Sequence, residues 1–311
     1  MHGTVDGFSH GLLTPVAAYL MACAGGVLGL RCTARAVRTS RSCGARGASR
    51  SRWLMLGAAA IGTGIWTMHF IAMTGFTVAE APIGYDRPTT WASLGVAVAM
   101  TGIGTVIVGH RGATAMALVT AGMITGLGIA SAHYLGMAGM RLQGRLAYDT
   151  GTVALSVLIA VVAATAALWA AVSVRGLLPS LGAGLVMGVA VSGMHYTGMA
   201  GVRVHVHGPV TADPVGDPAS ALIAPLLIGP VFFLVLAGGL ALSSGRRPGA
   251  AEDAGNPAYR HQCQWRAVRW FHAARYPDRT FDGALRGRQP LPAQRRPADG
   301  HRRAGEARPS R

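Results

Sequence analysis

Three copies of one short pattern place a histidine and a methionine within apolar segments. In each copy the Met follows the His by four residues, so that on a helix both side chains lie on one face, one turn apart. The three histidines are separated by 64 and then 62 residues. The copies read Trp66-Thr-Met68-His69-Phe70-Ile-Ala-Met73, Ser131-Ala-His133-Tyr134-Leu-Gly-Met137 and Gly193-Met194-His195-Tyr196-Thr-Gly-Met199.

The residue types in these copies predict a metal site. Imidazole nitrogen and thioether sulfur together suit copper, and the thioether favours Cu(I) in particular. Zinc usually recruits Cys or carboxylate ligands, and neither accompanies the copies. A single His in a membrane helix is more often a packing residue, and Met is a common core filler, but three copies at near-equal spacing reverse that balance. The predicted ligands are His69, Met73, His133, Met137, His195 and Met199.

Composition indicates a polytopic membrane protein. The chain has 311 residues, of which 51% are hydrophobic and only 13% are charged. Seven apolar segments are long enough to cross the roughly 30 Å hydrocarbon core of a bilayer. We expect an all-α membrane helix bundle with seven transmembrane helices. The predicted segments are 11–30, 53–76, 91–109, 114–140, 152–173, 177–201 and 220–243.

Glycine spacing predicts where these helices approach one another closely. Small residues four positions apart let helix backbones come together in lipid. Such pairs are Gly25 with Gly29, Gly122 with Gly126, and Gly184 with Gly188.

The distribution of arginine predicts the orientation. All 28 basic residues are Arg, and the net charge of +16 arises mainly from the loop 31–52 and the region beyond 243. Arg-rich loops stay on the cytoplasmic side, so we expect loop 31–52 and the C-terminus inside and the N-terminus outside. Loops 77–90 and 203–219 are then external. This pattern suits membrane topology and excludes nucleic acid as the expected partner.

The chain divides into two predicted parts, a membrane domain at 8–243 and a tail at 244–311. The tail is rich in Arg, Pro, Gly and Ala without a helical period, which predicts a disordered cytoplasmic segment. His205, His207, His2 and His10 lie outside the apolar segments and are interpreted as solvated. The cysteines fit neither a disulfide framework nor a zinc module. The spans contain no acidic residue, which argues against a proton-coupled transporter.

Met194-His195-Tyr196-Thr197 resembles the signature of the MHYT domain, a bacterial integral membrane sensor module. The resemblance covers about residues 8–243. It implies six or seven spans with the motif near the outer ends of three helices, copper binding, and sensing of a diatomic gas such as O2, CO or NO. The other copies read Met68-His69-Phe70-Ile71 and Ala132-His133-Tyr134-Leu135, so only the His and the later Met occur in all three.

The function expected from residues and resemblance is that of a sensor or regulator in the plasma (inner) membrane, not an enzyme. Family members often carry cyclic-dinucleotide or histidine kinase domains, and no such motif follows residue 243. We therefore expect the lipid bilayer, a gas ligand and a separate signalling protein as partners. Two alternatives stay open: copper transport or storage, and haem bound by two of the three histidines. Tyr134 and Tyr196 are either hydrogen-bond partners of the histidines or interfacial aromatics.

Overall fold

The computed structural model of the chain describes residues 5–6, 11–39, 47–78, 82–174, 176–206 and 217–243. The described part is mostly helical. The predicted tail 244–311 lies outside the described residues, as do His2, His10 and His207.

Seven helices account for the described apolar segments. They are α1 (Leu13–Thr39), α2 (Gly47–Met73), α3 (Arg87–Arg111), α4 (Ala115–Ala138), α5 (Thr150–Ser173), α6 (Leu177–Ala200) and α7 (Ala219–Ser243). Helices α1 to α6 are each long and apolar enough to cross a membrane. The side chains of α7 are described over Ile228–Ala241, and this part of the helix is apolar. The structure thus confirms a multi-pass helical membrane protein.

The first two helices are longer than predicted. Helix α1 continues to Thr39 and α2 begins at Gly47, so most of the predicted loop 31–52 is helical. The hydropathy pattern ends where arginines begin, but Arg and Ala are good helix formers and extend both helices past the apolar boundary. Here Arg35, in the extension of α1, lies over the ring of Trp53 of α2 at 5.1 Å, which links the two helices at this end.

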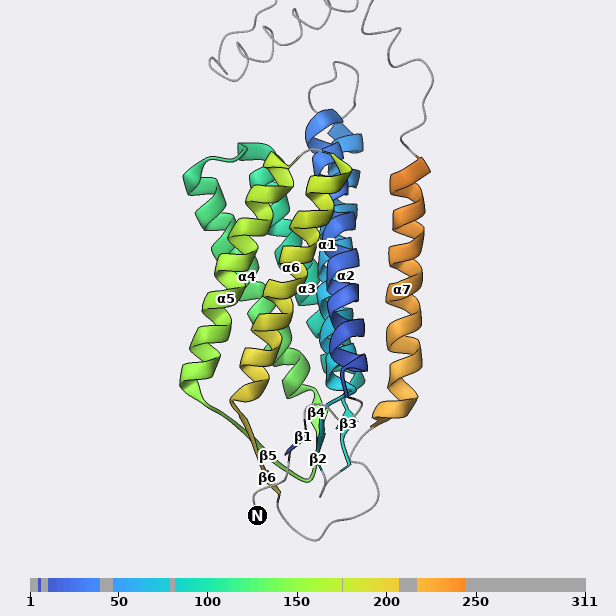
Figure 1. Ribbon diagram of the computed structural model, residues 1–311, viewed down its shortest axis with the longest axis vertical. Helices are drawn as coiled ribbons and strands as arrows, with labels where there is room; N and C mark the ends of the chain where they lie inside the picture. Colours follow the sequence, from blue (N-terminus) through green and yellow to red (C-terminus); the bar gives the residue numbers. More distant parts are fainter. Residues whose placement is uncertain are drawn as a thin grey trace, which may run out of the picture. The chain divides into compact units, whose positions relative to one another are not determined.

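The pairings of the helices close into a ring, and Figure 1 shows the bundle from the side with α7 at its edge. Each helix from α1 to α5 packs against the next along the chain, and α6 returns to α1, so that six helices close on one another. Helix α7 packs against the outside of α1 and α2. Because α2, α4 and α6 alternate around the ring and run in the same direction, equivalent residues on them meet near the centre.

Glycines allow several of these close contacts. A Cβ atom at Gly25 would lie 2.7 Å from the Cα atom of Gly64, so α1 and α2 meet backbone to backbone. A Cβ atom at Gly126 would overlap the backbone of α5 at Val161. Gly184 and the other glycines of the predicted pairs are likewise covered by a neighbouring helix. The structure confirms the interpretation of this spacing.

Short strands gather at one end of the bundle, where the sequence predicts only loops (Figure 1). They are β1 (Val5–Asp6), β2 (Thr77–Val78), β3 (Gly84–Tyr85), β4 (Met140–Arg141), β5 (Gly144–Tyr148), β6 (Val202–Val206) and β7 (Asp217–Pro218). They form three small antiparallel sheets with the orders β1-β2, β4-β3-β7 and β5-β6. Their shortness explains why periodicity does not reveal them, since most have two residues.

An acidic residue connects this strand end to the helices. Asp86 caps α3 by accepting hydrogen bonds from the backbone and hydroxyl of Thr89, and these bonds lower the pKa of its carboxyl. The same carboxylate pairs with Arg141 of β4 at 3.3 Å. Asp149 caps α5 in the same way through the backbone N–H of Thr152. These caps fix the helix starts beneath the sheets.

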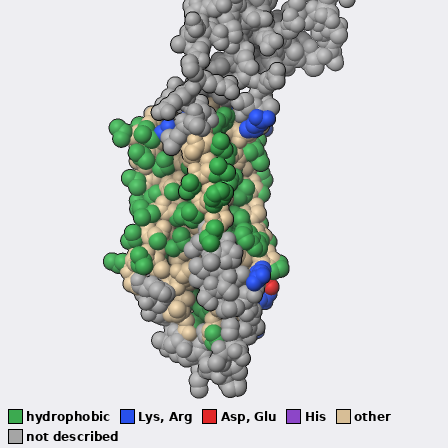
Figure 2. Space-filling view, turned by 90° about the vertical axis from the view of Figure 1, so that its right-hand side faces the viewer, with side chains coloured by type: hydrophobic (Ala, Val, Ile, Leu, Met, Phe, Trp, Pro, Cys, Tyr) green, Lys and Arg blue, Asp and Glu red, His purple; other side chains and the backbone are tan. Residues whose placement is uncertain are grey.

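The described surface has an apolar middle between charged ends. Figure 2 shows hydrophobic side chains along the length of the bundle, with Arg side chains only near its two ends. Large side chains such as Val162, Trp169 and Val189 are more than half exposed on α5 and α6. Such a continuous apolar belt is expected of a surface in contact with lipid.

Candidate metal centre

The three histidines of the repeated pattern meet inside the bundle. His69 on α2, His133 on α4 and His195 on α6 are between 1% and 5% exposed. Each lies in the last two turns of its helix, at the end of the bundle that carries the strands. Their ligand atoms all lie within 4.8 Å of one another. The structure therefore brings together the residues that the spacing predicts.

The Nδ1 atoms of the three rings converge. The Nδ1–Nδ1 distances are 3.1 Å for His69 and His195, 3.1 Å for His133 and His69, and 3.4 Å for His195 and His133. The ring planes are nearly perpendicular, at 81° to 89°. The rings are thus arranged like a three-bladed propeller around one point.

This triangle of nitrogens fits a metal ion better than a hydrogen-bond network. Each Nδ1 atom of a neutral ring is either a hydrogen-bond donor or an acceptor. If one Nδ1–H donates to a second Nδ1 atom, the third Nδ1 atom has no partner with good hydrogen-bond geometry within the triangle. The point equidistant from the three nitrogens lies about 1.9 Å from each, close to the metal–imidazole bond length of about 2.0–2.1 Å. A cation at that point would receive all three lone pairs.

The outer ring nitrogens are packed rather than hydrogen-bonded. The Nε2 atoms of His69 and His133 are buried and have no hydrogen-bond partner among the described residues. A ring that binds a metal through Nδ1 carries its proton on Nε2, and such an N–H usually has a partner. In this site steric packing, and not an orienting acceptor, fixes the direction of the two rings.

Glycines of the neighbouring copy provide that packing. A Cβ atom at Gly136 would lie 2.8 Å from Nε2 of His69, and one at Gly198 would lie 3.0 Å from Nε2 of His133. Gly136 and Gly198 each follow the His of their own copy by three residues. The rings of His69 and His133 therefore each lie over the small residue of the next copy. The sequence contains this signal, because a small residue follows the His by three positions in all three copies. The predicted ligand set does not make use of it.

Replacing either glycine with alanine should weaken the site. In Gly136→Ala or Gly198→Ala the new methyl group displaces a histidine ring and widens the Nδ1 triangle. We expect the affinity of the protein for copper to fall about 10- to 100-fold, which is the usual effect of disturbing the groups that orient metal ligands. The measurement is copper retention against a competing chelator.

The control for these variants lies on the same helix. Nothing lies within 4 Å of a Cβ atom at Gly193, so Gly193→Ala should keep the parental affinity. Parental affinity in folded Gly198→Ala protein would show that the ring packing does not position the ligands.

The walls around the triad are apolar and contain sulfur. A cavity of about 10 Å³ adjoins the three histidines and is lined also by Trp66, Met68 and Met194. Trp66 is fixed to α3 because its indole N–H donates to the Ser93 hydroxyl at 2.9 Å. Met68 and Met194, which directly precede two of the histidines, are thus the thioethers that share this cavity with the rings.

The predicted ligands Met73, Met137 and Met199 lie in a hydrophobic cluster with residues of the strands. Met73 and Met137 are buried in it together with Phe76, Val204 and others, and Met199 packs against it. This cluster lies one helical turn beyond the histidines toward the strand end. It separates the triad from water at that end, and a role of these three sulfur atoms as ligands stays a prediction.

Two other predicted candidates are not part of the triad. The hydroxyl of Tyr134 forms a hydrogen bond with Ser156 of α5 at 2.6 Å, while the Tyr134 ring packs edge-on against the His133 ring with 4.8 Å between centroids. His205 lies in β6 opposite Arg145 of β5, outside the triad. Among the described residues, the three histidines are the only cluster of His, Cys, Asp or Glu suited to a metal.

Comparison with known proteins connects this site to signalling. The chain matches the MHYT family, described as a bacterial signalling protein N-terminal repeat, at residues 62–121, 126–184 and 188–249. Each match contains one copy of the His pattern. No solved structure is matched.

Three curated relatives carry signalling names. The bifunctional diguanylate cyclase/cyclic di-GMP phosphodiesterase MucR of Pseudomonas aeruginosa is 41% identical over 164 residues, which are 51% of this chain and 24% of that protein. The cyclic di-GMP phosphodiesterase NbdA of the same organism is 38% identical over 53% of this chain and 21% of its own length. The signaling protein YkoW of Bacillus subtilis is 31% identical over 49% of the chain and 20% of its own length.

The similarity thus covers between 20% and 24% of each relative's length. The family matches, by contrast, cover more than half of the 311 residues and contain all three histidines of the triad. This chain therefore belongs to the MHYT family of bacterial signalling proteins.

Proposed function

We propose that this protein is a membrane sensor or regulator whose histidine triad binds one copper ion, and that the copper site recognises a diatomic gas such as O2, CO or NO. The observation that carries the proposal is the convergence of three Nδ1 atoms at 3.1–3.4 Å from one another. When bound, copper would supply a coordination position for the gas. The residues of the chain hold the ion, orient the rings and exclude water.

The environment of the triad supports Cu(I) over zinc. Helices α2, α4 and α6 contain no Asp or Glu, so a bound ion has no anionic ligand among them. Burying a charge in an apolar site is costly, and a singly charged ion costs less than a doubly charged one. The nearby sulfur atoms of Met68 and Met194 are soft ligands that also favour Cu(I).

The same geometry disfavours haem. Two axial histidines must lie on opposite sides of a flat macrocycle, whereas these nitrogens lie within 3.4 Å of one another beside a cavity of about 10 Å³. An optical spectrum of the purified protein tests this directly, because a haem protein would show an intense Soret band.

Sensing is also favoured over copper transport. Transfer of an ion across the bundle needs further ligand sites, and the described residues contain one His, Cys, Asp or Glu cluster suited to a metal. The relatives named for cyclic di-GMP synthesis or hydrolysis support a signalling role. We propose that the output of this chain passes to a separate signalling protein. A metal-uptake assay should find no copper accumulation beyond the amount bound to the protein.

We further propose that the chain has seven spans in the inner membrane, with the strand end and the N-terminus outside. The opposite end carries Arg31, Arg35, Arg50, Arg52 and Arg111 without an acidic residue among the described residues there. The end of the bundle that carries the strands has both Arg side chains and the carboxylates that cap the helices. In this proposed orientation, which follows the positive-inside rule, the histidine triad would lie in the outer half of the membrane.

Cysteine labelling tests this topology. In a background without native cysteines, Arg145→Cys on β5 should react with an impermeant maleimide in intact cells, because the strand end faces outward. Ala113→Cys, in the exposed connection between α3 and α4, should react only after permeabilisation. The opposite pattern of labelling would contradict the proposed orientation.

A further inference from the structure

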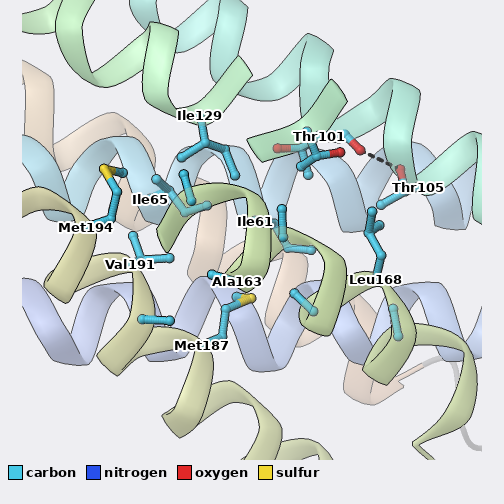
Figure 3. A pocket seen from close by; sticks show the side chains of 16 residues that line it. Ile61, Ile65, Thr101, Thr105, Ile129, Ala163, Leu168, Met187, Val191 and Met194 are labelled. Carbon is cyan, nitrogen blue, oxygen red and sulfur yellow. Dashed lines mark hydrogen bonds between the residues drawn. The ribbon is translucent and has the colours of Figure 1, made fainter. Parts of the chain in front are cut away.

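A second cavity lies in the bundle, next to the histidine site. It has a volume of about 30 Å³ and is lined by side chains of α2, α3, α4, α5 and α6 (Figure 3). A water-sized probe needs about 10–15 Å³ of such space, so the cavity has room for about two of them. That is the size of a diatomic molecule.

The walls of this cavity offer little to water. Its polar lining residues are Thr101, Thr105 and Thr125, and each hydroxyl donates to a helix carbonyl: Thr101 to Ala97 at 2.7 Å, Thr105 to Thr101 at 2.9 Å and Thr125 to Met100 at 3.4 Å. Figure 3 shows the hydrogen bond from Thr105 to Thr101 at one end of the cavity. A water molecule needs two to four polar partners, so an apolar guest is preferred here.

The cavity exists because α5 places its small side chains inward. Ala160, Ala163, Ala164, Ala167 and Ala171 form one face of α5 along the cavity. The large side chains Leu155, Leu158, Val162 and Trp169 face outward and are at least half exposed. A core filled with large residues would close this space, and the alanine face keeps it open.

This larger cavity adjoins the small cavity at the histidines, and the two share lining residues. Ile65, Ile129 and Met194 line both. In Figure 3 these three side chains lie together at one end of the larger cavity. Three flexible or branched apolar side chains therefore form the partition between an apolar chamber and the Nδ1 triangle.

We propose that this chamber receives an apolar diatomic gas and delivers it to the triad past Ile65, Ile129 and Met194. The proposal rests on the function proposed above, since it adds the chamber and partition to the copper site. Apolar gases concentrate in the hydrocarbon core of a membrane, and a dry chamber at the same depth selects them over water and ions. A gas molecule that passes this partition reaches the histidine triad from the side opposite the hydrophobic cluster at the strand end.

Filling the chamber tests the proposal. In Ala163→Leu the larger side chain occupies the cavity, whereas Ala166→Leu makes the same change on the exposed face of α5. Crystals of the full chain under xenon pressure should show xenon in the chamber of the parent and of Ala166→Leu, and none in Ala163→Leu. In copper-loaded protein, carbon monoxide should bind at least about tenfold more slowly in Ala163→Leu, with parental copper content. Ala167→Leu replaces Ala163→Leu if the latter does not fold.

The two readouts separate this proposal from the copper proposal. Protein that retains no copper contradicts the copper centre, and xenon density still reports on the chamber. Absence of xenon from the parental chamber would overturn the chamber. Parental carbon monoxide kinetics in copper-loaded, xenon-free Ala163→Leu would overturn the delivery route.

Discussion

Replacing all three histidines with alanine should abolish copper retention while the protein still inserts into the membrane. The triple variant of His69, His133 and His195 removes every nitrogen that converges on the site. It also removes buried ring nitrogens that lack hydrogen-bond partners, so insertion and folding should not depend on them. Variants with a single His→Ala change should lose less copper, because two imidazole rings and the neighbouring thioethers remain. Copper per protein after purification, with size-exclusion chromatography as the folding test, measures the effect.

A matched control for this variant is His110→Ala. His110 lies exposed near the end of α3, where its Nδ1 atom forms a hydrogen bond with the carbonyl of Val106 at 2.9 Å. It should leave copper content unchanged. A well-folded triple variant with the copper content of the parent would show that the repeats are packing features.

Enlarging Gly25 or Gly64 should strongly destabilise the bundle. In Gly25→Val or Gly64→Val the new side chain meets backbone atoms, since a Cβ atom at either position already lies 2.7 Å from the Cα atom of the other. Backbone cannot rotate away as a side chain does, so α1 and α2 must separate. Overpacking typically costs about 1–3 kcal/mol, and we expect at least the upper end of that range here. Thermal unfolding in detergent is the measurement.

The controls are glycines that face open space. Nothing lies within 4 Å of a Cβ atom at Gly95 of α3 or at Gly182 of α6, so Gly95→Val and Gly182→Val should keep near-parental stability. Equal stability of Gly25→Val and Gly95→Val would contradict the backbone contact between α1 and α2.

The sequence carries enough information to predict the helices and the meeting of the histidines. Apolar length defines the spans, and three copies on helices of the same direction place His69, His133 and His195 at one depth. The Gly25 and Gly29 spacing likewise indicates the close contact of α1. These features depend on local pattern and on alternation of direction, which one sequence is able to reveal.

Other features depend on tertiary packing and are not readable in advance. The pairing of β5 with β6 brings together residues more than fifty positions apart, as in Arg145 with His205. The use of Nδ1 depends on ring orientation, which Gly136 and Gly198 determine across helix interfaces. Met73, Met137 and Met199 share a helix face with the histidines, yet the strands create a hydrophobic cluster around them that spacing alone does not indicate.

X-ray absorption at the copper edge tests the central claim most directly. The account predicts that purified protein, loaded with one equivalent of Cu(I), shows about three imidazole nitrogen neighbours at about 2.0 Å, with any sulfur neighbour near about 2.3 Å. The triple His→Ala variant should lose the imidazole scattering. Copper without imidazole neighbours in the parent, or the same spectrum in the triple variant, would contradict a copper centre at the histidine triad.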